Sequence, residues 1–518
     1  MTIEYQTADA TVCGHSIRRS DSRIAGGPRG FAVAIGLLLF SLLWLAQLTH
    51  SSLSPPADNI EQLTWTGALD WGYYKHPPLP TWLLWLAGRM FGVTAWTSYG
   101  LAAVMVIMSM VIIWRLLSSM RSREYATLAL MAVLCITYYN GRLYFYNHNT
   151  VLLLISTASA ALIWKAWRTG SPGWWAALGL AIGLGLITKY QIAVTVACVV
   201  VFWLTQRGWR DTRQRSGILL AALVSLIIFV PHIEWLRTHD FAPVQYAMDT
   251  SLSMHLEYWT RVAVAFNWIL DQLLNRALLA WVLIAIALGL SGRRVTGGTA
   301  ISSANVVSEQ TTGSRALLLT WGIVPLAFMP LMSIATGSQL QMPWGTAFLP
   351  FAVPAVMEIL GWQARSRRLA WRSILIAFTT IQVGLLVLNH LTSPLGPKAM
   401  RDQYWRSFDE QALAAHIVKN VQMGSANQLP CVVAGPTDIA GVLALTLPNH
   451  PMVLVDERLD RSPWLTAAVL DNCSVLHVGR GVPEAGGLMV GELFPEVWWR
   501  VSASGASWVA LPVQARAH

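Results

Sequence analysis

Two groups of ionisable residues in this apolar sequence have the types and positions needed for chemistry. Lys189 lies in the stretch GLGLITKYQIAV, between the apolar runs 174–188 and 190–206. A lysine at such a boundary is costly to place unless it holds an anion. Upstream, Asp58 and Glu61 lie in the segment ADNIEQLTW, which follows the first apolar run. A carboxylate can act as a general base, so the two groups together indicate an active site.

The carboxylate segment has a structural interpretation and a functional one. Asp58, Glu61, Gln62 and Trp65 are spaced i, i+3, i+4 and i+7, and so share one face of a predicted helix. In the structural interpretation, Asp58 is the helix N-cap and Glu61 completes a capping box. In the functional interpretation the same carboxylates face a cleft. The two are compatible, because a capping carboxylate can also line a cleft.

The chain continues as DWGYYKHPPLPTWL, which is typical of a rigid loop that carries polar and aromatic side chains. Gly72 permits a tight turn, and Pro77 and Pro78 stiffen the backbone. Tyr73 and Tyr74 are amphipathic side chains that suit a membrane surface. His76 is either a functional group or an interfacial histidine bonded to a backbone carbonyl.

Composition indicates an all-α polytopic membrane bundle. The chain has 518 residues, of which 54% are hydrophobic and 12% are charged, about half of the roughly 25% charge of soluble proteins. Apolar runs of about 20 residues recur along the chain. The net charge of +10 lies in short connections and forms no basic stripe with interleaved aromatic residues. This pattern orients the protein in a membrane and argues against nucleic-acid binding.

The apolar runs predict about eleven transmembrane helices. They are 31–48, 97–117, 124–139, 148–166, 174–188, 190–206, 217–235, 276–291, 316–335, 344–362 and 373–391. The first run is a signal anchor or a signal peptide, and the lack of a small-x-small cleavage site after LTHSS favours the anchor. Arg and Lys clusters then fall on every second connection, which predicts a cytoplasmic N-terminus in a bacterial inner membrane.

Three domains follow from this pattern. Residues 1–30 form a cytoplasmic tail, and residues 31–391 form the membrane domain, with a first periplasmic loop at 49–96. Residues 392–518 contain CVVAG, MVLVD and SVLHVG, which predict strands of a small periplasmic α/β domain around a helical DIAGVLALTL.

Cys431 and Cys473 each begin a predicted strand of that domain. Because the periplasm is oxidising, the two cysteines are candidates for a disulfide. The sequence contains no C-x-x-C or H-E-x-x-H pattern, so no metal site is predicted from spacing.

The order of these motifs resembles that of GT-C glycosyltransferases. The stretch from Asp58 to Trp82, ending in W-G-Y-Y-K-H-P-P-L-P-T-W, is similar to the first outer loop of their family-39-like bacterial branch. That branch includes protein O-mannosyltransferases, the lipid A aminoarabinose transferase and rhizobial galacturonosyltransferases. Y-F-Y-N-H-N-T (144–150), L-I-T-K-Y (186–190) and Q-M-P-W-G-T-A-F-L-P (341–350) follow in the same order.

The resemblance implies an enzyme that moves a sugar from a polyprenyl-phosphate donor to an acceptor outside the cytoplasm. The acceptor would be lipopolysaccharide, lipid A, a cell-wall glycan or a protein. Asp58 would be the base that takes the proton of the acceptor hydroxyl, and Lys189 would hold the leaving phosphate. The alternative for Lys189 is a lysine that snorkels to lipid headgroups.

One departure from the family pattern concerns a metal. Many relatives carry Asp-Glu where this chain has Asp58 and Asn59. A divalent metal held by paired carboxylates is therefore possible but not established by the resemblance.

Further substrate-binding residues are expected from the same resemblance. Arg142 and Trp344 have alternatives, as a lipid-headgroup contact and an interfacial tryptophan respectively. The segment 236–275 is expected to be a polar loop that covers the site. The full set comprises Glu61, Tyr73, Tyr74, His76, Arg142, His148, Asn149, Lys189, Tyr190 and Trp344.

Two other function classes compete with the enzyme. A transporter or lipid flippase would show broken helices and midplane charges in related halves of the chain, and the sequence shows neither. A non-catalytic partner of envelope assembly would tolerate the loss of Asp58.

The predicted orientation can be tested with topology reporters. Fusions after residues 120, 168, 210 and 367 should report the cytoplasm, and a fusion after residue 400 should report the exterior, because the basic clusters lie on alternate connections. A cytoplasmic signal after residue 400 would contradict the orientation.

Overall fold

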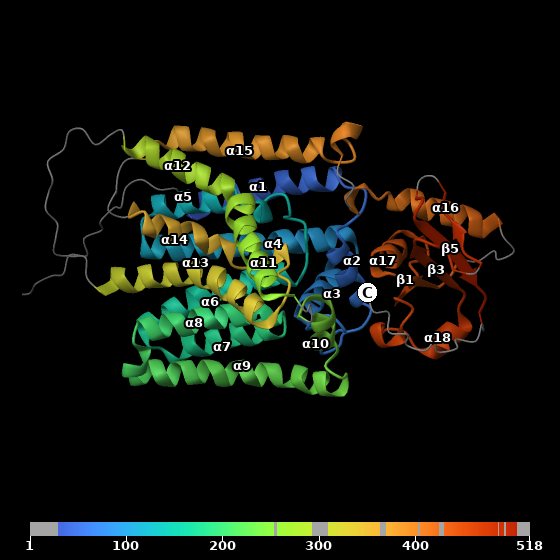
Figure 1. Ribbon diagram of the computed structural model, residues 1–518, viewed down its shortest axis with the longest axis horizontal. Helices are drawn as coiled ribbons and strands as arrows, with labels where there is room; N and C mark the ends of the chain where they lie inside the picture. Colours follow the sequence, from blue (N-terminus) through green and yellow to red (C-terminus); the bar gives the residue numbers. More distant parts are fainter. Residues whose placement is uncertain are drawn as a thin grey trace, which may run out of the picture.

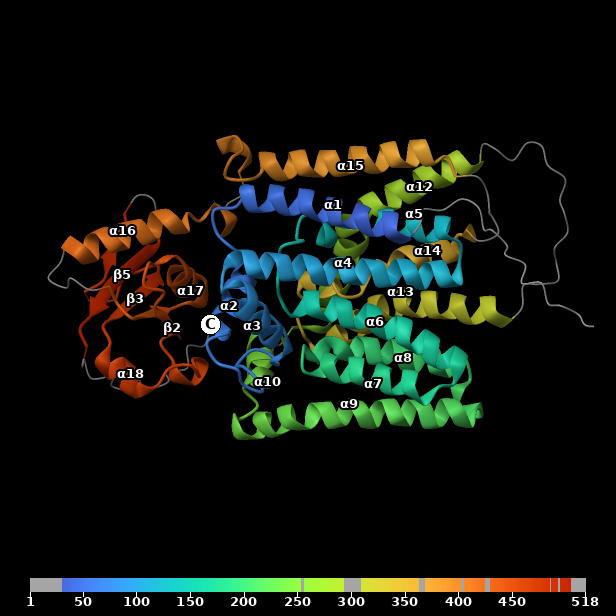
Figure 2. The ribbon, with the colours of Figure 1, turned by 180° about the vertical axis from the view of Figure 1, so that it is seen from behind.

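The computed structural model describes residues 30–252, 256–292, 309–362, 369–401, 405–423, 429–484, 486–491 and 494–504. The predicted cytoplasmic tail lies almost wholly outside these residues. Most helices run side by side along the long axis of the molecule (Figure 1). All of the described strands follow the last bundle helix and stand beyond one end of the bundle, as the opposite view also shows (Figure 2).

The helical bundle is made by fifteen α-helices of very different lengths among the described residues. They are α1 (Gly30–His50), α2 (Ala57–Trp65), α3 (Leu79–Phe91), α4 (Ala95–Met120), α5 (Arg123–Val133), α6 (His148–Thr169), α7 (Pro172–Leu186), α8 (Ala193–Thr205), α9 (Thr212–Thr238), α10 (Ala242–Ala247), α11 (Tyr258–Leu270), α12 (Leu278–Gly292), α13 (Glu309–Thr336), α14 (Ala352–Ile359) and α15 (Trp371–Leu391).

A membrane bundle is confirmed, although the count of eleven spans is not. Each predicted run coincides with a helix, but only six described helices are long and apolar enough to cross a membrane by themselves. These six are α1, α4, α6, α9, α13 and α15. The other runs correspond to short helices such as α7 and α8, which hydropathy alone cannot distinguish from full spans.

The segment 236–275 differs from the polar loop predicted for it. It contains α10 and α11, and α11 continues through a π-helical turn, Asp271–Arg276, into α12 with a bend of 55°. Arg276 and Asp271 form an ion pair of 3.1 Å at this bend. Because these charges interrupt the apolar run, hydropathy alone assigns α12 to a span and α11 to the preceding loop. The prediction that the chain lacks broken helices is therefore wrong at this position.

The C-terminal unit, residues 405–504, is the expected α/β structure. Its strands are β1 (Val432–Gly435), β2 (Met452–Val455), β3 (Val475–Arg480), β4 (Leu488–Met489) and β5 (Val497–Ser502), with helices α16 (Glu410–Met423), α17 (Thr437–Thr446) and α18 (Ala467–Asn472). The sheet order is β2-β1-β3-β5-β4. β1 runs parallel to both neighbours, whereas β5 is antiparallel to β3 and β4.

This unit packs directly on the helix that carries the candidate carboxylates. A Cβ atom at Gly441 of α17 would lie 2.5 Å from Cγ2 of Ile60 and 2.8 Å from Oγ1 of Thr64, both on α2. Only glycine permits so close an approach between these helices. The C-terminal unit thus forms part of the immediate surroundings of α2.

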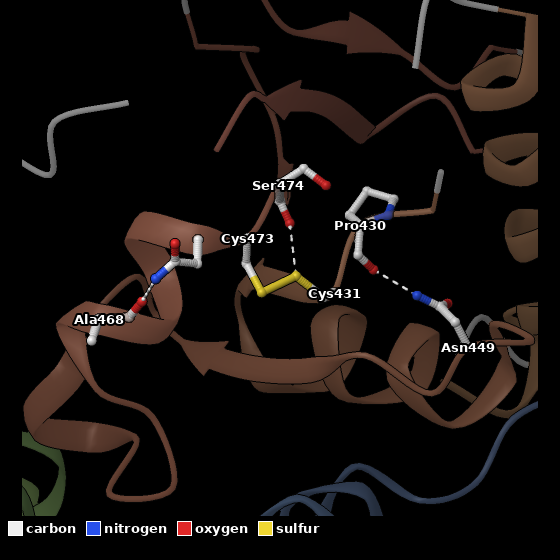
Figure 3. The surroundings of a disulfide bond; sticks show 7 residues. Pro430, Cys431, Asn449, Ala468, Cys473 and Ser474 are labelled. Carbon is white, nitrogen blue, oxygen red and sulfur yellow. Dashed lines mark hydrogen bonds between the residues drawn. A yellow bond between two sulfur atoms is a disulfide. The ribbon is translucent and has the colours of Figure 1, made fainter. Parts of the chain in front are cut away.

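The predicted disulfide is present. Cys431 and Cys473 are bonded and their Cα atoms lie 5.8 Å apart, and Figure 3 shows the bond between the residues that precede β1 and β3. Those strands are paired neighbours, with Val432 opposite Val475. The bond therefore joins two strands that the sheet already holds in register.

Replacing either cysteine by serine should destabilise the C-terminal unit by roughly 2–4 kcal/mol, because the bond closes a long loop in the unfolded chain. Thermal unfolding and protease resistance of the full-length protein would measure this effect. Wild-type protein treated with a reductant is the control, and it should unfold like the variants. Equal stability of oxidised and reduced protein would contradict the prediction.

Candidate active site

The candidate carboxylate lies in the first turn of α2, at the end of the bundle next to the C-terminal unit. Pro55 and Pro56 lead into the helix, and Pro56 occupies the N-cap position with φ −55° and ψ 142°. No side chain caps α2, so the prediction that Asp58 is the N-cap is wrong. Proline serves there instead because a residue preceding the helix needs no N–H donor.

Asn59 fixes the orientation of α2. Its side chain is fully buried and donates to Oγ of Ser98 (2.8 Å) and to the carbonyl oxygen of Tyr144 (2.9 Å). Its Oδ1 accepts a hydrogen bond from the backbone N–H of Tyr146 (3.0 Å). The residue that departs from the Asp-Glu pattern is thus an anchor that ties α2 to α4 and to the segment before α6.

Unlike the buried Asn59, Asp58 is exposed, and the hydrogen-bond partner of Asp58 is Asn147. Nδ2 of Asn147 donates to Oδ2 of Asp58 (2.7 Å), while Oδ1 of the same amide accepts from the N–H of Thr150 (3.0 Å) as the N-cap of α6. One amide therefore caps a long helix and holds the carboxylate. Asn147 was not predicted as a site residue, although the N-x-x-T spacing of a helix cap would have indicated it.

Lys189 lies in the turn between α7 and α8, outside both helices. Nζ donates to Oδ1 of Asn149 (2.6 Å) and lies 5.4 Å from the ring centroid of Trp344. Burial lowers the pKa of Lys189 to about 7, and the charge of Asp58 opposes that shift. Lys189 therefore points into the protein rather than snorkelling to a surface.

Asp58 and Lys189 line one cavity of about 730 Å³. Its polar end also includes His76, His148, Asn149, Tyr190 and Trp344. Its apolar wall includes Phe328, Met329 and Met332 of α13. A cavity with one charged end and one apolar wall suits a ligand that has an anionic head and a hydrocarbon chain.

The two histidines of the cavity are packed together. The rings of His76 and His148 lie 4.0 Å apart, and His148 also contacts Trp65 edge to face. Burial, together with the neighbouring His148 and Lys189, holds the pKa of His76 well below its ordinary value. His76 is therefore neutral near pH 7 and can exchange hydrogen bonds without adding charge.

Tyr190 is held by a buried histidine behind the cavity wall. Its hydroxyl lies 2.8 Å from Nε2 of His232, which is fully buried, and Nδ1 of His232 contacts the carbonyl oxygen of Trp71. The predicted site residue therefore connects the cavity to the first loop.

Three predicted site residues lie away from the lining of this cavity. Tyr73 stacks on Trp65 with ring centroids 4.8 Å apart and donates to the carbonyl oxygen of Ala68, so it packs the loop. Arg142 lies over the ring of Phe145, and Tyr74 lines a separate, smaller cavity. Local sequence cannot separate these roles, because Tyr73 and Tyr74 are adjacent and chemically identical.

Glu61 has a different partner from the one predicted. It forms an ion pair with Lys75 instead of closing a capping box, and both side chains are largely buried. Burial raises the pKa of Glu61, and Lys75 opposes this effect. Lys75 was not predicted as a site residue, although it lies beside His76 in the conspicuous loop.

A paired-carboxylate metal site does not fit these residues. Asp58 accepts a hydrogen bond from Asn147, and the carboxylate of Glu61 is already neutralised by Lys75. Within the described part of the chain, no group of three or more His, Cys, Asp or Glu side chains is arranged to hold a metal ion.

Comparisons with known proteins agree with this geometry. Residues 75–235 match the dolichyl-phosphate-mannose-protein mannosyltransferase family. The crystal structure of ArnT from Cupriavidus metallidurans bound to undecaprenyl phosphate superposes on this chain with a TM-score of 0.59 at 14% sequence identity. The superposition covers 91% of this chain and 97% of the ArnT chain. The chain has the GT-C fold. The predicted fold class is thereby confirmed.

Three relatives from Rhizobium johnstonii share part of the sequence. The lipopolysaccharide core galacturonosyltransferase RgtB is 24% identical over 50% of this chain and 53% of its own length. A second lipopolysaccharide core galacturonosyltransferase, RgtA, is 25% identical over 65% of this chain and 63% of its own length. The lipid A galacturonosyltransferase RgtD is 20% identical over 45% and 48%. The matched regions thus cover between 48% and 63% of the length of these relatives.

Proposed function

We propose that this chain is an inner-membrane glycosyltransferase that moves a sugar from a polyprenyl-phosphate donor to lipopolysaccharide or lipid A on the periplasmic face. The observation that carries the proposal is the single cavity shared by Asp58 and Lys189 within an ArnT-like fold. The names of RgtA, RgtB and RgtD support galacturonic acid as the sugar. The basic clusters support the orientation.

The donor would enter along the apolar wall of α13 and place its phosphate against Lys189. Asp58 would take the proton of the acceptor hydroxyl as its oxygen attacks the anomeric carbon. The bond from that carbon to the phosphate oxygen breaks, and the electron pair leaves with the phosphate. Phosphate is a good leaving group that Lys189 stabilises, so a second acid is unnecessary. Since the carboxylates do not fit a divalent cation, the mechanism includes no metal step.

The competing transport function receives less support. Among the described helices only one pair, α11 and α12, forms a bent span. A transporter built from repeats would place a second broken helix at the corresponding position of its other half. The cavity instead brings together the carboxylate of Asp58 and the ammonium group of Lys189, which supports group transfer.

Asp58→Asn should lower the rate of sugar transfer by about 10²–10⁴, the share of a positioned general base. The asparagine oxygen can still accept from Asn147 and no cap is lost, so membrane levels and melting temperature should be unchanged. The measurement is transfer from a polyprenyl-phosphate sugar by purified protein at matched concentrations. Full activity of the variant would remove Asp58 as the base.

Asp70→Asn is the matched control for Asp58. Asp70 lies in the same loop, accepts a hydrogen bond from the N–H of Trp71 (2.6 Å), and lies outside the lining of both described cavities. Its variant should transfer sugar at the wild-type rate. Glu61→Gln is less suitable as a control, because it would leave Lys75 without its partner.

Lys189→Ala should raise the donor KM on the order of tenfold to a hundredfold, because a charge-assisted contact to phosphate is lost. The donor is a phosphodiester with constant charge, so its wild-type KM should rise as pH increases above about 7 and Lys189 loses its proton. Lys189→Arg remains protonated, and its KM should be nearly independent of pH in this range.

Lys165→Ala provides the comparison for Lys189. Lys165 also lies over an aromatic ring, that of Trp174 at 4.3 Å, but it is exposed and is absent from the cavity lining. Its variant should keep the wild-type donor KM and pH dependence. An unchanged donor KM in Lys189→Ala would contradict the phosphate-binding role.

A further inference from the structure

A second cavity adjoins the first at its charged end. It has a volume of about 330 Å³ and lies between the first loop and the C-terminal unit. Four residues, Asp58, Glu61, Lys75 and Tyr246, line both cavities. The candidate base is therefore reached from two directions, one largely apolar and one polar.

The floor of the second cavity is the carboxyl edge of the parallel part of the sheet. Pro436, Thr437 and Asp438 directly follow β1, and Asp456 directly follows β2. Ligands of open α/β sheets bind outside the carboxyl ends of the parallel strands. Helix α17 begins at this floor, with Thr437, and no side chain caps its N-terminus.

The walls carry many charges, and these charges are paired within the protein. Arg461 binds Asp456 (2.6 Å), Asp438 binds Arg480 (2.7 Å), and Glu61 binds Lys75. A strongly charged group that enters this cavity would have to break such pairs. A neutral or weakly charged ligand rich in hydroxyl groups can instead exchange hydrogen bonds with the same side chains.

Aromatic rings complete the lining. The guanidinium of Arg461 lies 4.8 Å from the ring centroid of Tyr74, and Lys75 lies 5.4 Å from that ring and 5.3 Å from the ring of Tyr246. Tyrosine rings offer an apolar surface to the C–H face of a sugar and a hydroxyl to its oxygens. A peptide acceptor would require an extended groove or a free strand edge, which a cavity of this size does not offer.

We propose that the second cavity is the acceptor subsite and binds a sugar ring of a glycolipid, with Asp438, Asp456 and Arg461 of the C-terminal unit as specificity-determining residues. The acceptor hydroxyl reaches Asp58 from this side, while the donor phosphate reaches Lys189 from the first cavity. The inference rests on the proposed function and assigns a site to the acceptor sugar of that function.

The test compares Arg461→Gln and Asp438→Asn with wild-type full-length protein. Fully deacylated lipopolysaccharide, which carries both core and lipid A sugars, serves as the soluble acceptor probe. Each variant should raise the KM for this acceptor on the order of tenfold, because hydrogen bonds to charged groups are lost. The donor KM and the slow hydrolysis of donor without acceptor should stay within about twofold of wild type.

A neighbouring ion pair supplies the control. Arg458 and Asp460 pair at 2.5 Å in the same connection after β2, are largely exposed, and lie outside the second cavity. Asp460→Asn should leave both KM values unchanged. A rise in the donor KM for Arg461→Gln, or no change in the acceptor KM, would overturn the assignment.

A binding measurement separates this inference from the proposed function. Saturation-transfer NMR should detect the deacylated glycan on wild-type protein in nanodiscs, and the signal should fall with Arg461→Gln but not with Asp460→Asn. Binding without transfer would refute the enzymatic function and leave the subsite standing. Transfer with equal glycan binding by both variants would refute the subsite and leave the enzyme standing.

Discussion

The placement of α2 is the constraint on which the rest of the site depends. A nine-residue helix has little intrinsic stability, so tertiary contacts must hold it. Asn59 supplies three buried hydrogen bonds to α4 and to the backbone before α6, and leaving any of these groups unpaired would be costly. Because Asn59 is fixed, the adjacent Asp58 is directed to the cavity and meets Asn147.

The opposite side of the cavity depends on the cost of burying a charge. Lys189 has one neutral hydrogen-bond partner, Asn149, and an aromatic neighbour, Trp344. These contacts do not fully replace water, which is why burial lowers its pKa. An anion placed beside Lys189 would restore the charged form, which is the physical basis of the phosphate-binding role proposed for this lysine. Lys75, by contrast, already has a carboxylate and is not available in the same way.

The C-terminal unit belongs to the architecture of the site. Its helix α17 packs on α2 through Gly441, and its first parallel strands direct their carboxyl ends at the same carboxylates. The disulfide between the residues preceding β1 and β3 holds the sheet from its other end. A unit that appears in sequence as a separate appendage thus builds part of the wall next to Asp58.

Sequence alone determined the features that depend on composition and local pattern. Long apolar runs indicated the membrane bundle, and short apolar segments rich in valine indicated β1, β2 and β3. The motifs around Asp58 and Lys189 indicated the two charged groups that share a cavity. β4 and β5 were not predicted; β4 has only two residues, and so short a segment carries no periodic signal.

Only the tertiary structure decided which side chains meet. Tyr73 and Tyr74 differ by one position, yet one packs against Trp65 and the other lines the second cavity. Glu61 lies fourteen positions from Lys75 along the chain, and Asp58 lies far from Asn147, so no local spacing encodes either pair. Burial of Glu61 and of Asn147 accounts for these pairs, because a polar group removed from water must find another polar group wherever the fold brings one near.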